Sequence, residues 1–164
     1  MRSNLSKIIQ LNSDPYYHSV FNVEDYKSFY FGKDPDGNII FLIKPLLIQT
    51  TQNAISSIGK YLDISFNTTC EFKIHDASHI GEFTLLTLKT QEVLMNRIFV
   101  SLCEDLIELI CDEPSYDRVI EVVNGLKELF VNFLRPSTNT EIGLWGELFV
   151  ISQAQNIENA IDSW

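Results

Sequence analysis

The residues whose types and spacing could support metal-dependent chemistry begin with a stretch in the first half of the chain. Asp63 is followed by seven residues and then by Glu71-Phe72-Lys73, which matches the pattern D-x7-E-x-K. Carboxylates on adjacent strands beside a lysine are the groups that metal-assisted phosphodiester cleavage requires. The pattern fixes few positions, and alternation along one strand explains it more simply. We therefore interpret Glu71 and Lys73 as outward-pointing strand residues.

Two imidazoles and a carboxylate lie close together in His75-Asp76-x-x-His79. Zinc favours such ligands, and on a helix the two histidines would share a face. The stretch is predicted to be a turn, however, and no further ligand pair stands out. We interpret these residues as belonging to a surface turn.

The cysteines Cys70, Cys103 and Cys111 form no C-x-x-C pair, and their number is odd. A disulfide framework is therefore not expected, and a reducing compartment fits better. No signal peptide is apparent, and no apolar run reaches the length that spans a membrane. The expected location is cytoplasmic, with no membrane contact.

A further candidate is Glu147, on a helix that opens with the capping box Thr138-x-x-Glu141. This helix is apolar nearly all round, which predicts that it is buried between layers. A carboxylate there is costly unless it has a partner. Gly143 and Gly146 allow another backbone or a ligand to come close. Glu147 is thus either a metal-linked or otherwise paired carboxylate, or a glutamate that lies at a solvent seam or is bonded to a structural partner.

The elements that must position these residues are strands in the first half of the chain. Asp34-Pro35-Asp36-Gly37-Asn38 is typical of a type I turn followed by a left-handed residue. The flanking segments 28–31 and 39–43 are aromatic and β-branched, so we expect a β-hairpin. A short helix is expected at 49–62. Two further strands are expected at 61–75 and 82–89, and the turn that joins them at 75–81.

From Gln91 the apolar period becomes that of a helix. A first helix is expected to about residue 112, and a second from 115 to 135, where Pro136 ends it. Inward positions of the first helix are Met95, Phe99, Leu102, Leu106 and Ile110. Its outer face carries an acidic stripe: Ser101, Glu104, Asp105, Glu108 and Asp112. This stripe is most simply solvated, and it could instead recognise a basic protein partner.

The 164-residue chain has a formal net charge of −10, and the charge is uneven. Residues 1–90 carry a net charge of −1, and residues 91–164 carry −9. DNA is attracted by clustered lysine and arginine, and no such cluster exists here. The acidic second half should repel nucleic acid.

The helix Gly143-Leu144-Trp145-Gly146-Glu147-Leu148, with Phe133-Leu134-Arg135 before it and Ala160-Ile161-Asp162-Ser163-Trp164 after it, resembles a motif of the PD-(D/E)XK family of bacterial, restriction-endonuclease-type proteins. The hairpin Tyr30-Phe31-Gly32-Lys33-Asp34-x-x-Gly37 is similar to the first half of that family. The resemblance covers most of the chain.

The resemblance implies that this helix opens a nuclease core. In the family, strands carrying an Asp and an E-x-K follow the helix and hold a divalent cation that activates water. Glu147 would then be a secondary catalytic acid beside the metal. The resemblance implies Mg²⁺ for the whole family protein, and no cofactor for this chain alone. It also implies that DNA is bound by a segment beyond Trp164.

The expected fold class is α+β, with an antiparallel sheet of about four strands in the first half. Two long helices and a third, buried helix follow. Residues 1–136 are expected to form an accessory domain, and residues 137–164 the first helix of a truncated nuclease-like core. The expected role is accessory, in bacterial defence against foreign DNA, without cleavage by this part itself. The alternative is a non-enzymatic protein-interaction module that uses the acidic helical face.

Overall fold

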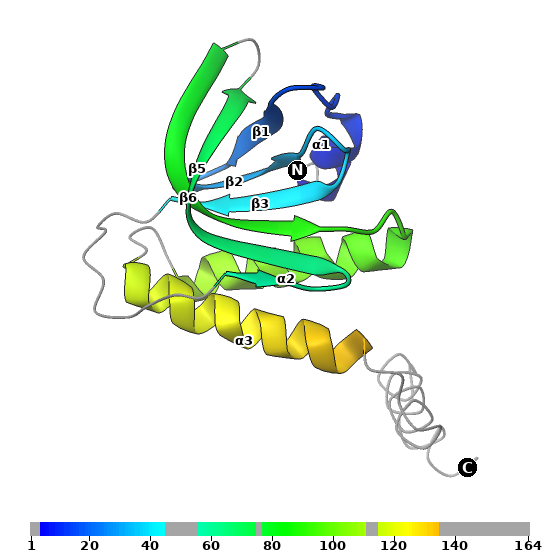
Figure 1. Cartoon of the computed structure of the whole chain (residues 1–164), viewed down its shortest axis with the longest axis vertical. Helices are drawn as coiled ribbons and strands as arrows, with labels where there is room; N and C mark the ends of the chain where they lie inside the picture. Colours follow the sequence, from blue (N-terminus) through cyan, green and yellow to red (C-terminus); the bar gives the residue numbers. More distant parts are fainter. Residues whose placement is uncertain (1–3, 45–55, 75–76, 111–114, 135–164) are drawn as a thin grey trace. The chain divides into compact units, whose positions relative to one another are not determined.

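The computed structural model describes residues 4–44, 56–74, 77–110 and 115–134 (Figure 1). The elements in chain order are α1 (Asn4–Gln10), β1 (His18–Val23), β2 (Tyr26–Lys33), β3 (Ile39–Ile43), β4 (Ser57–Ile58), β5 (Leu62–Ile74), β6 (Ala77–Leu88), α2 (Val93–Ile110) and α3 (Tyr116–Leu134). The chain divides into two units, Met1–Phe130 and Val131–Trp164. The third helix expected from residue 138 lies outside the described residues.

The strands form one mixed sheet that closes into a barrel. Antiparallel pairings link β1 to β2, β2 to β3, β3 to β6 and β6 to β5. A parallel pairing of β1 with β5, through His18–Phe72 and Ser19–Lys73, then closes the ring. The short strand β4 adds to the other edge of β5. The expected antiparallel sheet of about four strands is therefore wrong in both number and topology, because β1 was not recognised and it supplies the closing pair.

The closed sheet is strongly staggered. A path of paired residues leaves β5 at one end and returns to the same strand near its other end: Lys73, Ser19, Lys33, Ile39, Leu88 and Leu62. Such a stagger requires the strands to tilt against the barrel axis. It also explains the length of β5 and β6, since different parts of each strand pair with different neighbours.

Two apolar layers lie on the two faces of this sheet. Inside the barrel the buried cluster consists of Val20, Ile40, Leu42, Cys70, Phe72 and Phe83. On the outer face Phe41 stacks against Phe29 at 6.1 Å and lies 4.8 Å from Phe31, between ring centroids. Because β3 alternates between the two layers, all five of its residues are buried. This explains why the segment 39–43 reads as one continuous apolar run.

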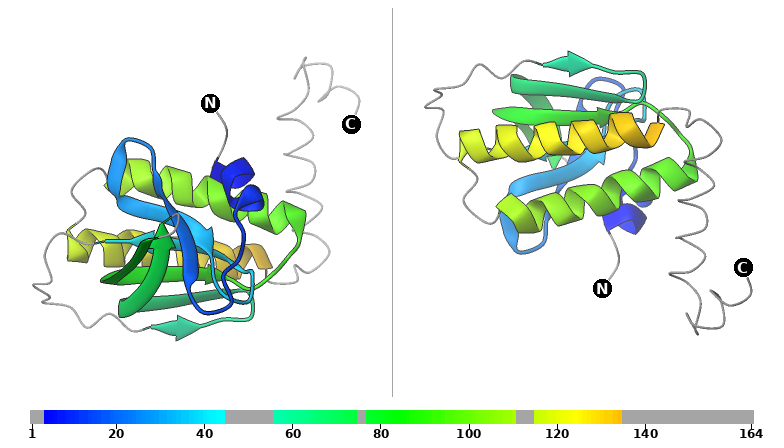
Figure 2. Two further views of the ribbon diagram at one scale, coloured as in Figure 1. Left: turned by 90° about the horizontal axis from the view of Figure 1, so that it is seen from above. Right: turned by 90° about the horizontal axis from the view of Figure 1, so that it is seen from below.

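The helices cover the outer face of the sheet. In both Figures 1 and 2, α2 and α3 lie side by side along it. Phe99 of α2 and Phe130 of α3 meet edge to face, with centroids 6.2 Å apart. The N-terminal helix α1 contacts both α2 and β2, and its Ile8 is fully buried.

The expected helices 91–112 and 115–135 are confirmed within the described residues as α2 and α3. Leu102 is only partly buried, whereas Val100, Cys103 and Ile107 join the buried face. The expected helix at 49–62 is wrong where the structure describes it, because Ser57–Ile58 is a strand. The expected turn at 75–81 is shorter, since β6 already begins at Ala77.

The expected hairpin of β2 and β3 is confirmed, and its turn is held by one carboxylate. The Asp34 carbonyl accepts a hydrogen bond from the Gly37 amide at 3.0 Å, and Gly37 has a φ of 83°. Asp34 Oδ1 accepts from the Asn38 amide at 2.8 Å, and Oδ2 accepts from Asn38 Nδ2 at 2.9 Å. A buried aspartate thus replaces water for the turn's polar groups.

Gly32 tests the close approach of β1 and β2, and Gly125 in α3 provides a control. A Cβ on Gly32 would lie 2.1 Å from the Ser19 carbonyl oxygen, whereas a Cβ on Gly125 in α3 would meet nothing within 4 Å. Gly32→Ala should therefore lower the free energy of unfolding by about 1–3 kcal/mol, as overpacking does. Gly125→Ala should raise it by about 0.5–1 kcal/mol by reducing the entropy of the unfolded chain. Urea unfolding measures both values, and equal effects of the two substitutions would contradict the register of β1 on β2.

Candidate functional site

The residues of the D-x7-E-x-K pattern do not form a site. Asp63 and Glu71 are eight positions apart on the same strand, β5, so about 3.3 Å per residue separates them by on the order of 25 Å along the strand. Asp63 accepts a hydrogen bond from the Gly59 amide at 3.1 Å and forms an ion pair with Lys89 at 2.7 Å. These bonds give Asp63 a structural role at the β4–β5 turn. The structural interpretation of the pattern is confirmed.

The described residues do not fit a magnesium or zinc site. Among them, no three His, Cys, Asp or Glu side chains come together closely enough to hold a metal ion. His79 stacks on Phe72 with centroids 5.5 Å apart, on a strand rather than in a turn. His75, Asp76 and Glu147 lie outside the described residues. The described part of the chain therefore supplies no ligand set for a metal-dependent step.

The described cysteines lack the environment of a nucleophile. Burial raises the pKa of the Cys70 thiol to about 11. The pKa of the Cys103 thiol is also well above its usual value, because of burial first and the Glu104 charge second. Both thiols stay protonated at neutral pH, and the thiolate is the reactive form. They act as small apolar residues of the two layers.

The acidic stripe of α2 is narrower than expected. Glu104 is partly buried and accepts a hydrogen bond from Asn4 Nδ2 of α1 at 2.8 Å, so it fastens α1 to α2. Asp105 and Glu108 are exposed, and Asp112 lies outside the described residues. A binding surface for a basic partner would thus have fewer available carboxylates than the sequence suggests.

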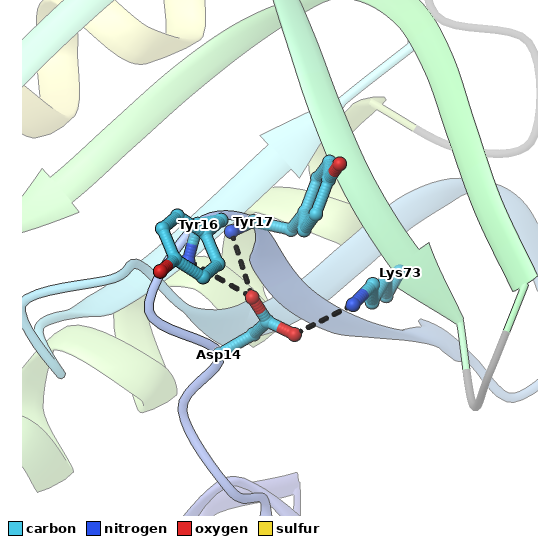
Figure 3. A network of polar contacts seen from close by, with 4 residues as sticks. All are labelled: Asp14, Tyr16, Tyr17 and Lys73. Carbon is cyan, nitrogen blue, oxygen red and sulfur yellow. Dashed lines mark hydrogen bonds and ion pairs between the residues drawn. The ribbon is translucent and has the colours of Figure 1, made fainter.

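The most developed polar network joins the segment before β1 to the end of β5 (Figure 3). Asp14 Oδ1 accepts hydrogen bonds from the amides of Tyr16 at 2.9 Å and Tyr17 at 3.1 Å. Asp14 Oδ2 lies 2.7 Å from Lys73 Nζ. The same Nζ is 4.5 Å from the centroid of the Tyr17 ring, which is within cation–π distance.

This network stabilises the closure of the barrel. Lys73 pairs with Ser19 across the parallel β1–β5 contact, so the ion pair with Asp14 lies beside the two closing rungs. The bond to Lys73, followed by the amide bonds, holds the pKa of Asp14 below its ordinary value. A carboxylate that remains ionised and fully engaged suits anchoring better than proton transfer.

A histidine lies at the same closure. His18 Nδ1 is buried and has no hydrogen-bond partner among the residues that the structure describes. Burial lowers the pKa of His18, and the nearby charge of Asp34 opposes this effect. The ring is therefore neutral at pH 7. Its protonation would place a charge at the mouth of the barrel, so this residue stabilises the fold less as the pH falls below about 6.5.

Sequence reasoning missed Asp14, Tyr17 and the partnership of Lys73. A local signal existed for the first, because Asp-Pro at 14–15 favours a turn in which the aspartate bonds amides two and three residues ahead. The pairing of Asp14 with Lys73 spans 59 positions, and no pattern in the chain indicates it.

Replacing Lys73 tests the cause of the Asp14 pKa. In Lys73→Met the pKa of Asp14 should rise, yet stay below 3.8, because the Tyr16 and Tyr17 amides still donate to it. Lys89→Met removes a lysine that pairs with Asp63 instead and should leave the value unchanged. NMR titration of the Asp14 carboxyl measures both.

The sign of the effect on stability follows from the lowered pKa. Asp14 contributes to folding above its ordinary pKa and loses this contribution as the pH falls through the lower, folded-state value. In Lys73→Met, the free energy of unfolding should therefore decrease less steeply than in the wild type as the pH falls below about 4. A shift of the Asp14 pKa in Lys89→Met but not in Lys73→Met would contradict the network.

No helix within the described part of the chain is long and apolar enough to span a membrane. A family model described as "Putative PD-(D/E)XK family member, (DUF4420)" matches residues 19–164. No curated protein and no solved structure matches. The family match covers the barrel, both long helices and the segment with Glu147, and the chain therefore belongs to this PD-(D/E)XK family.

Proposed function

We propose that the barrel and its helices are an accessory domain of a nuclease-like protein, and that cleavage is carried out by other residues. The observation that supports this proposal is the arrangement of carboxylates. The barrel carboxylates that might have held a metal are far apart or engaged in structural bonds. Among the described residues, no cluster of three or more His, Cys, Asp or Glu side chains could hold a metal ion. Membership of the PD-(D/E)XK family supports a nuclease-like protein as the whole.

The cations of the described domain also favour an accessory role over direct DNA binding. Several of them are already paired with acids or backbone carbonyls. These contacts are Lys7 with Glu24, Lys73 with Asp14, Lys89 with Asp63, Arg118 with Glu121, and Lys33 with the carbonyls of Ile9 and Leu11. A phosphate would have to compete with these partners for these five cations, which weakens their attraction to DNA. As part of this proposal, DNA contact is assigned to residues outside the described domain.

Glu147 is the residue of this chain that we assign to cleavage. It belongs to the G-L-W-G-E-L sequence that resembles the first helix of the family's nuclease core. Its proposed role is that of a secondary acid near the metal. Mg²⁺ would be held mainly by carboxylates of the following strands and would supply an activated water. The biological role proposed for the whole protein is bacterial defence against foreign DNA.

The alternative function, a protein-interaction module built on the acidic face of α2, has less support. Glu104 is used within the domain, and Arg97 lies on the same outer surface as Asp105 and Glu108. Salt-sensitive binding of a basic protein, with loss of binding in Asp105→Asn, would favour this alternative.

Two glutamate variants of the full-length protein test the assignment. Glu147→Gln removes a charge from the proposed cleavage site and should lower Mg²⁺-dependent cleavage of duplex DNA at least about tenfold. Glu71→Gln removes a charge from the exposed face of β5 and should leave cleavage unchanged. Initial rates of plasmid cleavage, with melting temperatures as a control for folding, measure both effects.

The opposite outcome would relocate the site. An unchanged rate in Glu147→Gln excludes Glu147 from cleavage. A strong loss in Glu71→Gln with normal folding would restore the E-x-K of β5 as the catalytic pattern. Calorimetric titration of residues 1–164 with Mg²⁺ is an independent readout, and tight binding that disappears in Glu71→Gln would contradict the accessory role.

A further inference from the structure

Within the described part of the chain, the first half of β6 has an open edge. Residues Ala77–Phe83 pair with β5 on one side, whereas pairing with β3 on the other side begins only at Thr84. Figure 1 shows this part of the β5–β6 hairpin projecting from the barrel, with β6 outermost and no strand beside it within the described chain. An unpaired strand edge presents amide and carbonyl groups that can pair with another strand.

This edge lacks the features that usually prevent strand addition. Residues 77–81 are Ala-Ser-His-Ile-Gly, without proline, lysine or arginine. Ile80 is 71% exposed. The sheet's other outlying strand, β4, has only two residues and offers little to pair with. An unpaired edge that is uncharged from Ala77 to Gly81 and carries an exposed isoleucine is a site for strand pairing.

We propose that the β6 edge binds the β6 edge of a second copy of this chain, in antiparallel register about a two-fold axis. Such an axis stands perpendicular to the sheet, so outward-facing residues of one copy meet outward-facing residues of the other. Ile80 then lies directly opposite the second copy's Ile80, and Ser78 lies opposite the second copy's Glu82. Each exposed isoleucine is covered by its equivalent.

Charge and symmetry favour this occupant. The segment is neutral from Ala77 to Gly81, so it offers nothing to attract a strongly basic or acidic peptide, and its own copy brings no like charge against it. In the proposed register the first charged residue, Glu82, meets a serine hydroxyl that can donate a hydrogen bond. Neighbouring registers would instead place Ile80 opposite Ser78 or Glu82 and leave the apolar pair unmade.

The pairing is short, and weak self-association is expected. About six residues per copy form an interface at the low end of the range for specific contacts. Dimerisation should therefore depend on concentration and be detectable on the order of 100 µM. This inference concerns assembly and does not depend on the assignment of Glu147.

Matched isoleucine variants test the surface. Sedimentation velocity of residues 1–164 should show an average mass that rises with concentration. Ile80→Lys places two charges against each other at the interface and should weaken self-association at least about tenfold. Ile58→Lys changes an isoleucine that is 90% exposed on β4 and should associate as the wild type does. Circular dichroism melting confirms that both variants fold.

Cysteine variants test the register. Cα atoms of directly opposed residues in an antiparallel pair lie about 4.5–5.5 Å apart, which is within the Cα separation that a disulfide spans. Ile80→Cys should form a cross-linked dimer under mild oxidation. Ser78→Cys should not, because its two copies would be four positions out of register. The unsubstituted chain is the control for cross-linking through its own cysteines.

The results that would overturn the proposal are distinct. A wild-type chain that remains monomeric up to about 500 µM excludes the interface at the concentrations where weak contacts are detected. Dimerisation that survives Ile80→Lys, or that is lost in Ile58→Lys instead, places the contact elsewhere. Cross-linking of Ser78→Cys rather than Ile80→Cys excludes the register, and with it the isoleucine pair on which the proposal rests.

Discussion

The parallel pairing of β1 with β5 is the contact on which the rest of the domain depends. It has only two rungs, His18–Phe72 and Ser19–Lys73, yet it converts an open sheet into a closed barrel. A parallel contact joins distant parts of the chain and carries a large loop-closure cost. Asp14 offsets part of that cost by binding the amides ahead of β1 and Lys73 of β5 at once (Figure 3).

Closure determines where side chains can perform chemistry. The barrel interior is filled by an apolar cluster that includes Cys70 and Phe72, and the outer face of β2, β3 and β6 is covered by helices. Polar groups are thereby displaced to the barrel ends, where Asp34, Asp63 and Asp14 each organise a turn or an ion pair. The stagger of the sheet also extends the β5–β6 hairpin beyond its neighbours and leaves the first half of β6 unpaired with any described strand on one side.

Sequence reasoning recovered the elements whose signals are local. The Asp34–Asn38 turn, its two strands and the helices α2 and α3 are encoded by turn residues and by apolar period within a few positions. The strand β1 was missed because its alternation is interrupted by polar residues such as Asn22, and its role comes from partners far along the chain. The partnership of Asp14 with Lys73 is likewise non-local. The D-x7-E-x-K pattern was interpreted as structural, and the structure agrees, since three suitable residues on one strand cannot converge. Glu147 stays a prediction, supported by the family to which the chain belongs.

The central claim, a barrel closed by β1 and β5, is most directly tested by NMR of residues 1–164. Backbone nuclear Overhauser effects should connect His18 with Phe72 and Ser19 with Lys73, alongside those that connect Ser19 with Lys33 in the antiparallel β1–β2 pair. If the Ser19–Lys33 contacts are present and the contacts from β1 to β5 are absent, the sheet is open and the domain is not a barrel.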